Sequence, residues 1–145
     1  MNIQKTITRV FRKGIKSKLV NDIMDLLSKE GYRPVFEDDY VVFKIEGTTL
    51  CFSFDKQDVH FTRLILPNFY EVTGENKVLA LYNMNYLNRG YKFATLEMEN
   101  EIVSAFIDML LFPASIEEIV PRMIHCVMGI GKDFLREMEK GYSCD

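Results

Sequence analysis

The chain has 145 residues, about the length that one hydrophobic core organises, and its 48% hydrophobic content excludes a wholly disordered protein. All 21 acidic residues follow residue 18, so the body is acidic and lacks the basic surface that nucleic-acid binding requires. Three cysteines do not make a disulfide framework, and no apolar run approaches the ~20 residues that span a membrane, so we expect a cytoplasmic protein.

Residues 1–17 form a basic amphipathic arm, in which apolar residues recur at helical spacing with bases between them. The bases that could contact an anionic surface are Lys5, Arg9, Arg12, Lys13 and Lys16. Peripheral membrane binding, a partner groove and an RNA contact are the functional interpretations. We favour a simpler one, in which the apolar stripe packs on the domain and the bases stay solvated.

The first half of the chain predicts one helix followed by strands. Residues 18–30 have the period of an amphipathic helix, which Gly31 ends. Alternating polar and apolar residues then predict four strands, at residues 33–37, 40–46, 48–54 and 59–66. Asp38-Asp39 and Gly47 supply the first two turns, and Pro67 closes the fourth strand because proline cannot donate to a sheet.

The second half predicts a helix, a hairpin and a long helix. The helix at residues 75–88 ends near Gly90, and its inner stripe is expected to hold or adjoin Val78, Leu79, Leu81, Tyr82, Asn85 and Tyr86. The hairpin pairs residues 91–99 with 101–111 around a turn at Glu99-Asn100, where asparagine tolerates the backbone required. Ser115 and Glu118 predict a capping box for the last helix, which Pro121 should kink or restart.

These elements predict an α+β fold. The order is α-β-β-β(-β)-α-β-β-α, with an antiparallel sheet of five to six strands and helices on one face. We expect the arm at residues 1–17, a single domain at 18–140 and a C-terminal tail at 141–145.

Known catalytic and cofactor motifs are absent, so we expect no enzyme activity, no metal and no cofactor. His125 and Cys126 are adjacent on a helix and point about 100° apart, which suits no chelate. Cys51 and His60 could form a nucleophile pair across neighbouring strands, although free cysteine usually behaves as a small apolar residue. An enzyme or small-ligand-binding domain therefore stays as an alternative function.

Residues 85–97 read Asn-Tyr-Leu-Asn-Arg-Gly-Tyr-Lys-Phe-Ala-Thr-Leu-Glu and resemble the YbjN-like bacterial proteins, a family described as sensory-transduction regulators. The residues that carry the resemblance are Asn85, Asn88, Arg89, Lys92 and Phe93. A structural interpretation of the two asparagines is that they satisfy carbonyls at a helix end or occupy a left-handed turn. The order of elements is also similar to the type III secretion chaperone fold.

The chaperone-like resemblance implies homodimers that hold an extended stretch of a client protein, without enzyme activity or cofactor. We therefore expect a protein-binding module, chaperone-like or regulatory. Its candidate contacts lie on one strand and on two apolar edges, at Thr49, Cys51, Ser53, Phe61 and Phe106. The remaining alternative is a membrane-peripheral protein anchored by the arm.

Overall fold

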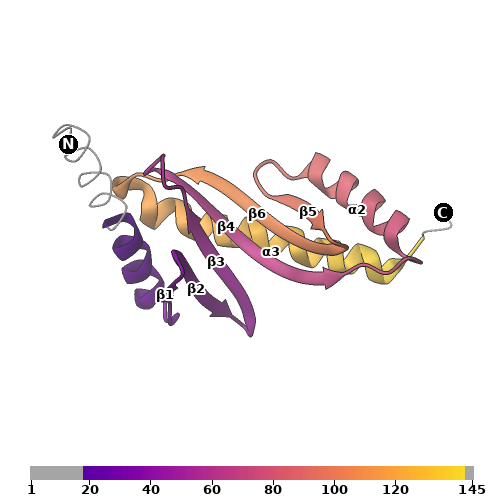
Figure 1. Ribbon diagram of the computed structural model, residues 1–145, viewed down its shortest axis with the longest axis horizontal. Coiled ribbons are helices and arrows are strands. Elements are labelled where there is room, and N and C mark those ends of the chain that lie inside the picture. The colour runs from indigo at the N-terminus through magenta and orange to yellow at the C-terminus, as the bar shows by residue number, and fades with distance from the viewer. Residues whose placement is uncertain (1–17, 143–145) are drawn as a thin grey trace, which may run out of the picture. The chain divides into compact units, whose positions relative to one another are not determined.

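The computed structural model describes residues 18–142, so the predicted arm lies outside the described residues (Figure 1). Residues 18–29 are helical. The elements that follow are β1 (Val35–Glu37), β2 (Tyr40–Ile45), β3 (Thr48–Phe54), β4 (Phe61–Glu71), α2 (Lys77–Gly90), β5 (Thr95–Glu99), β6 (Ile102–Leu110), the 3-10 turn η1 (Pro113–Ser115) and α3 (Ile116–Lys140). This order confirms the predicted α+β fold class. None of the helices within residues 18–142 is long and apolar enough to cross a membrane.

The six strands form one antiparallel sheet in the order β1-β2-β3-β4-β6-β5. The β2–β3 hairpin places Val42 opposite Cys51, and the β5–β6 hairpin places Leu96 opposite Ala105. β4 also runs antiparallel to β6, because the N–H of Val72 at the end of β4 donates to the carbonyl of Glu101 at the start of β6, at 2.7 Å.

Three tight hairpin turns have the left-handed backbone that two-residue turns require. The paired φ values are 51° and 66° at Asp38-Asp39, 49° and 82° at Glu46-Gly47, and 51° and 64° at Asn100-Glu101. Two successive residues with positive φ match the right-handed twist of the flanking strands. The structure therefore has turns at the first two predicted positions, whereas the third is shifted by one residue from the Glu99-Asn100 expected.

The described residues divide into two compact units. One contains residues 18–63 and 109–120, and the other contains residues 64–108 and 121–142. In the first unit, the helix at 18–29 buries Leu19, Ile23 and Leu27. Phe43 and Phe52 are also buried and stack with ring centroids 5.8 Å apart. This unit therefore has an aromatic and aliphatic core of its own.

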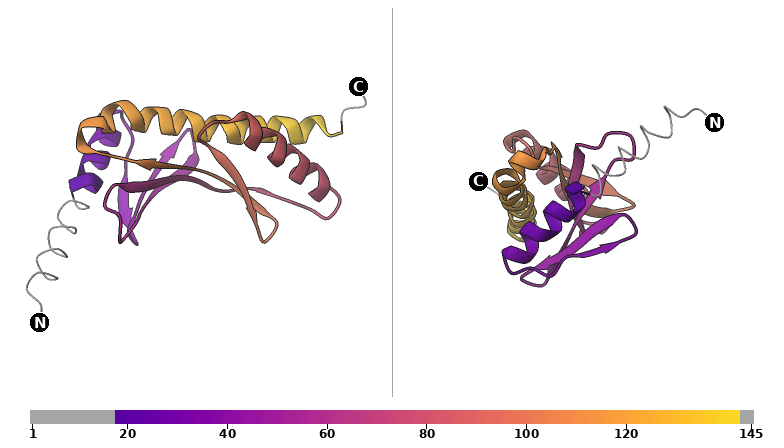
Figure 2. Two further views of the ribbon diagram at one scale, coloured as in Figure 1. Left: turned by 90° about the horizontal axis from the view of Figure 1, so that it is seen from above. Right: turned by 90° about the vertical axis from the view of Figure 1, so that its left-hand side faces the viewer.

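In the second unit, α3 runs along one face of β4 and β6 (Figure 2). Phe134 of α3 is fully buried, and the rings of Phe69 and Tyr70 meet it edge-on at centroid distances of 5.9 and 5.3 Å. One turn earlier, Gly131 is buried beside Leu66. A methyl group at Gly131 would lie only 2.5 Å from Leu66 Cδ2, so glycine permits this close approach of helix and strand.

The prediction that Pro67 closes the fourth strand was wrong, because β4 continues to Glu71. A bulge accommodates the proline: Asn68 has φ 47°, and its N–H donates to Ser104 Oγ at 2.8 Å. Leu66 and Phe69 are three residues apart and both lie near Gly131, although a regular strand would place them on opposite faces. The bulge therefore turns both side chains toward α3.

The predicted cap of the last helix was also wrong, as was the restart at Pro121, one of the two alternatives there; the kink stays a prediction. Ser115 ends the 3-10 turn, and its hydroxyl donates to the carbonyl of Phe112 at 2.9 Å, so Ser115 and Glu118 do not form the expected capping box. α3 then continues through Pro121 without restarting.

Thr62 gives the first test of the core. Its hydroxyl is buried and finds no hydrogen-bond partner among residues 18–142. An unpaired buried hydroxyl costs roughly 1–3 kcal/mol, so Thr62→Val should raise the free energy of unfolding by about 1 kcal/mol. Urea unfolding measures this as a higher midpoint at constant slope. Thr62→Ser, which keeps the hydroxyl and loses a methyl group, should be destabilising; a lower midpoint for the valine variant would contradict the assignment.

Gly131 gives the second test. Alanine normally stabilises a helix interior by about 1 kcal/mol relative to glycine. In Gly131→Ala the contact with Leu66 should reverse that gain and lower the thermal midpoint. Gly129→Ala is the matched control on the same helix, because its methyl group would lie at an ordinary 3.4 Å from the Tyr91 hydroxyl. Equal midpoints for the two variants would refute the close packing.

Candidate functional site

One face of α2 exposes large apolar side chains. Val78, Leu81, Tyr82 and Tyr86 are 70%, 48%, 66% and 61% exposed, respectively. Of the six residues predicted on or beside the inner stripe, only Leu79 is buried, so the predicted orientation of this helix was wrong. The residues that α2 buries are Leu79, Ala80, Asn83, Met84 and Leu87.

The orientation of α2 follows from its contact with α3. Asn83 is only 4% exposed, and its side-chain amide donates to Met138 Sδ at 3.3 Å. A helix that is apolar nearly all round has no single stripe from which its buried face can be read. The signal in the sequence was the presence of two apolar faces, one of which must remain exposed unless a partner covers it.

Asn88 joins the end of α2 to the start of β5. Its side-chain amide donates to the carbonyl of Leu96 at 3.1 Å, and its side-chain oxygen accepts from the N–H of Leu96 at 2.7 Å. The interpretation that Asn88 satisfies its own helix end was therefore wrong, because it pairs with a neighbouring strand. Gly90 is the last residue of α2, and Tyr91 closes the helix by donating its N–H to the carbonyl of Leu87 at 2.9 Å.

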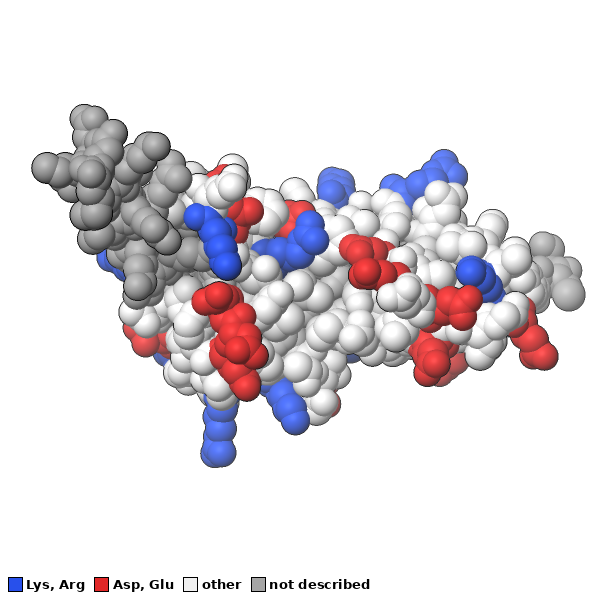
Figure 3. Space-filling view, viewed as in Figure 1, with Lys and Arg blue, Asp and Glu red and all other residues white. Residues whose placement is uncertain are grey.

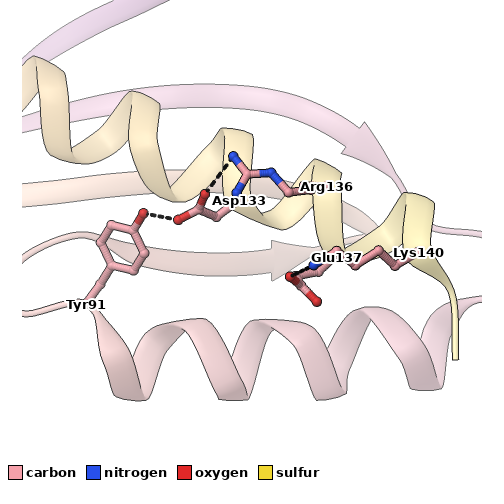
Figure 4. Close-up of polar contacts among 5 residues, drawn as sticks. All are labelled: Tyr91, Asp133, Arg136, Glu137 and Lys140. Carbon is pink, nitrogen blue, oxygen red and sulfur yellow. Dashed lines mark hydrogen bonds and ion pairs between the residues drawn. The ribbon is translucent and has the colours of Figure 1, made fainter. Parts of the chain in front are cut away.

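Tyr91 ties the same loop to α3. Its hydroxyl donates to a carboxylate oxygen of Asp133, and the other oxygen lies 3.3 Å from Arg136 Nη2 (Figure 4). Burial, the hydrogen bond to Asp133 and the negative charge of Asp133 raise the pKa of Tyr91 to about 12. The phenol therefore stays protonated at neutral pH and acts as a structural donor.

The other family-like residues face solvent. Asn85, Arg89 and Lys92 are exposed, and Phe93 is 60% exposed. Asn85 and Arg89 lie on α2, and Lys92 and Phe93 lie in the loop that follows its C-terminal end. We call the exposed set the α2 surface, which comprises Val78, Leu81, Tyr82, Asn85, Tyr86, Arg89, Lys92 and Phe93.

The predicted strand contacts lie on the sheet as follows. Thr49, Cys51 and Ser53 share the half-buried face of β3, opposite the buried Leu50 and Phe52. Phe61 and Phe106 are half-buried on β4 and β6 and belong to different units. The face shown in Figure 3, viewed as in Figure 1, has acidic and basic side chains beside one another in several places, with uncharged surface between these groups. These five residues stay predicted contacts.

Cys51 and His60 do not form a nucleophile and base. Burial raises the pKa of the Cys51 thiol, which disfavours the reactive thiolate. His60 Nδ1 lies 3.2 Å from the carbonyl oxygen of Leu111, and its ring stacks on Phe112 at 4.2 Å. Each residue is therefore held in contacts that support the fold and not in a catalytic pair. Within residues 18–142 no group of three His, Cys, Asp or Glu side chains could hold a metal ion.

The raised pKa of Tyr91 can be tested by titration. A pKa raised from an ordinary value of about 10 means that the fold favours the protonated phenol, so this stabilisation is complete below pH ~10 and is lost as the pH rises toward 12. In an absorbance titration of phenolate, Tyr91→Phe should remove the group that ionises at about pH 12. Asp133→Asn should lower its pKa; an unchanged titration curve in both variants would contradict the contact.

No model of a known protein family matches the chain, and no curated protein matches it either. Among solved structures, the chain is similar to YbjN from E. coli, a candidate transcription regulator, with a TM-score of 0.62. The match covers 83% of this chain and 93% of that chain at 6% sequence identity, so it concerns the fold alone. The chain has a YbjN-like fold, as the resemblance of residues 85–97 implied.

Proposed function

We propose that the chain is a non-enzymatic protein-binding module, chaperone-like or regulatory, that holds a segment of a partner protein on the α2 surface. The exposure of four large apolar side chains on one helix face carries this proposal. Soluble monomers rarely leave a contiguous apolar patch uncovered unless it binds something.

The chemistry of the α2 surface suits protein contacts. Burying an exposed Val or Leu side chain completely is worth roughly 1.5–3 kcal/mol. Tyrosines such as Tyr82 and Tyr86 are typical anchors of interfaces, because they combine a large apolar ring with a hydrogen-bonding tip. A partner that covers this face therefore gains both apolar burial and specific polar contacts.

The α2 surface is also held in place by three long-range contacts. Asn83 pairs with Met138, Asn88 with Leu96, and Tyr91 with Asp133. These contacts fix α2 and the following loop to the neighbouring helix and strand. A surface that is already ordered loses less conformational entropy on binding, which favours affinity.

A regulatory role fits the same surface. YbjN is described as a candidate transcription regulator, and a regulator can act through protein contacts. The acidic body of the chain favours a protein partner over DNA. Free Cys51 and Cys126 are compatible with the reducing cytoplasm in which we place the protein.

The proposal is tested by changing one aromatic anchor at a time. Tyr82→Ser and Tyr86→Ser should each weaken binding of a partner recovered from native cell extract by about tenfold or more, because each removes an apolar anchor. The partner is identified by mass spectrometry of material retained on the immobilised chain, and its Kd is measured by titration.

Tyr142→Ser is the matched control, since Tyr142 is 64% exposed and Tyr86 is 61% exposed. The control variant should retain the partner with wild-type affinity. Retention of the same proteins at the same affinity by both α2 variants would overturn the proposal.

A further inference from the structure

The unpaired bases of the α2 surface lie together at the C-terminal end of the helix. Residues 76–96 contain three bases and no acid. Lys77, at the start of α2, is paired with Glu101 at 3.3 Å. Arg89 and Lys92, in the last turn and in the following loop, are exposed and have no ion-pair partner among residues 18–142. This end of the α2 surface therefore carries two positive charges without a counter-charge.

The surroundings do not cancel this positive charge. The C-terminal end of a helix carries the equivalent of about −0.5 charge, which is less than the two bases supply. Asp133, which accepts a hydrogen bond from Tyr91 of the same loop, is already paired with Arg136 at 3.3 Å. The net charge of the whole chain is −3, but charges farther away than ~10 Å are largely screened at 0.1 M ionic strength. A ligand on α2 therefore meets a locally positive surface.

The exposed side chains of α2 have the spacing of a helix–helix seam. Successive seam positions lie four, three and four residues apart, as the inward positions of heptads do, at Val78, Tyr82, Asn85 and Arg89. The seam is apolar at its first two positions and basic at its last. It rises about 10 Å from the second position to the last, at ~1.5 Å per residue. A partner that matches this seam has apolar side chains at one end and negative charge at the other.

We propose that the partner of the α2 surface is an acidic amphipathic helix of another protein that packs antiparallel to α2. The inference rests on the proposed function and names the chemistry of the occupant. Apolar side chains of the partner cover Val78, Tyr82 and Tyr86, and acids in its first turn face Arg89 and Lys92. The antiparallel direction follows from the dipole of the partner, because acids are favoured in the first turn of a helix.

A nucleic acid suits the α2 surface less well. Phosphate contacts supply most of the affinity for nucleic acid, and two unpaired bases neutralise at most two phosphates. Single-stranded bases could stack on Tyr86 and Phe93. The other end of the surface, with Val78 and Leu81, has no free charge for a phosphate chain, because Lys77 is already paired. Apolar surface next to positive charge therefore favours a protein segment.

The experiment is a fluorescence anisotropy titration of the purified full chain with two labelled peptides. Each peptide has about 20 residues, long enough to form helix, with leucines at seam spacing. One peptide carries glutamates in its first turn, and the other carries lysines there. The wild-type chain should bind the glutamate peptide about tenfold or more tightly than the lysine peptide, because like charges are disfavoured across an interface. Added salt should reduce this preference.

R89E/K92E should reverse the preference, which also controls for any difference in helicity between the peptides. R89Q/K92Q, which removes the two charges without reversing them, should abolish the preference. K44E/K56E is the matched control, because it changes the net charge equally at two exposed bases outside the α2 surface, and it should keep the wild-type preference. Tyr82→Ser should weaken the binding of both peptides equally, because it removes an apolar anchor and no charge. Circular dichroism confirms that each variant is folded.

Equal affinity of the wild-type chain for the two peptides overturns the inference, as does a preference that R89E/K92E leaves unchanged. Tighter binding of a single-stranded oligothymidylate, abolished by R89E/K92E, would also overturn it and would identify a nucleic-acid surface. In the first two cases the proposed function still stands if Tyr82→Ser and Tyr86→Ser lose a partner from extract. If these two variants retain every partner and bind both peptides like the wild type, the proposed function fails as well.

Discussion

Asn83 lies on the buried face of α2, between the apolar Leu79 and Leu87, and its side-chain amide donates to Met138 Sδ of α3. A buried amide without a hydrogen-bond partner is costly, so α2 packs with Asn83 directed at α3. Val78, Tyr82 and Tyr86 then point outward because they lie on the other side of the helix. The exposed α2 surface is thus the opposite side of a helix whose buried face combines apolar packing with one paired polar side chain.

In the segment that resembles the YbjN-like family, some residues hold the fold together and others are exposed to solvent. Asn88 and Tyr91 fix the loop after α2 to β5 and α3, and this fixed loop presents Lys92 and Phe93 to solvent. A short segment can therefore hold a loop in place and expose a surface at the same time. The same division explains why the two asparagines differ, since Asn85 is exposed whereas Asn88 is paired.

Local sequence patterns were enough to predict much of the architecture. The Asp38-Asp39 and Gly47 turns, the alternation of β3 and the apolar period of α3 depend on neighbours within a few residues, and the structure has all of these elements. The bulge at Asn68 could not be foreseen, because it depends on Ser104, 36 positions away in the sequence. A proline in the middle of a strand is therefore interpreted as the end of that strand unless such a partner is known.

The sequence by itself determined the order of elements, the first two hairpin turns and the acidic body, and it placed apolar residues on two opposite sides of α2. Only the tertiary structure decided which of those sides is buried and with which strand Asn88 pairs. It also showed that Cys51 and His60 each have other contacts and do not form a catalytic pair. The physical reason is the range of the interactions. Turn and helix preferences act between near neighbours, whereas the burial of a side chain is set by residues that the fold brings from distant parts of the chain.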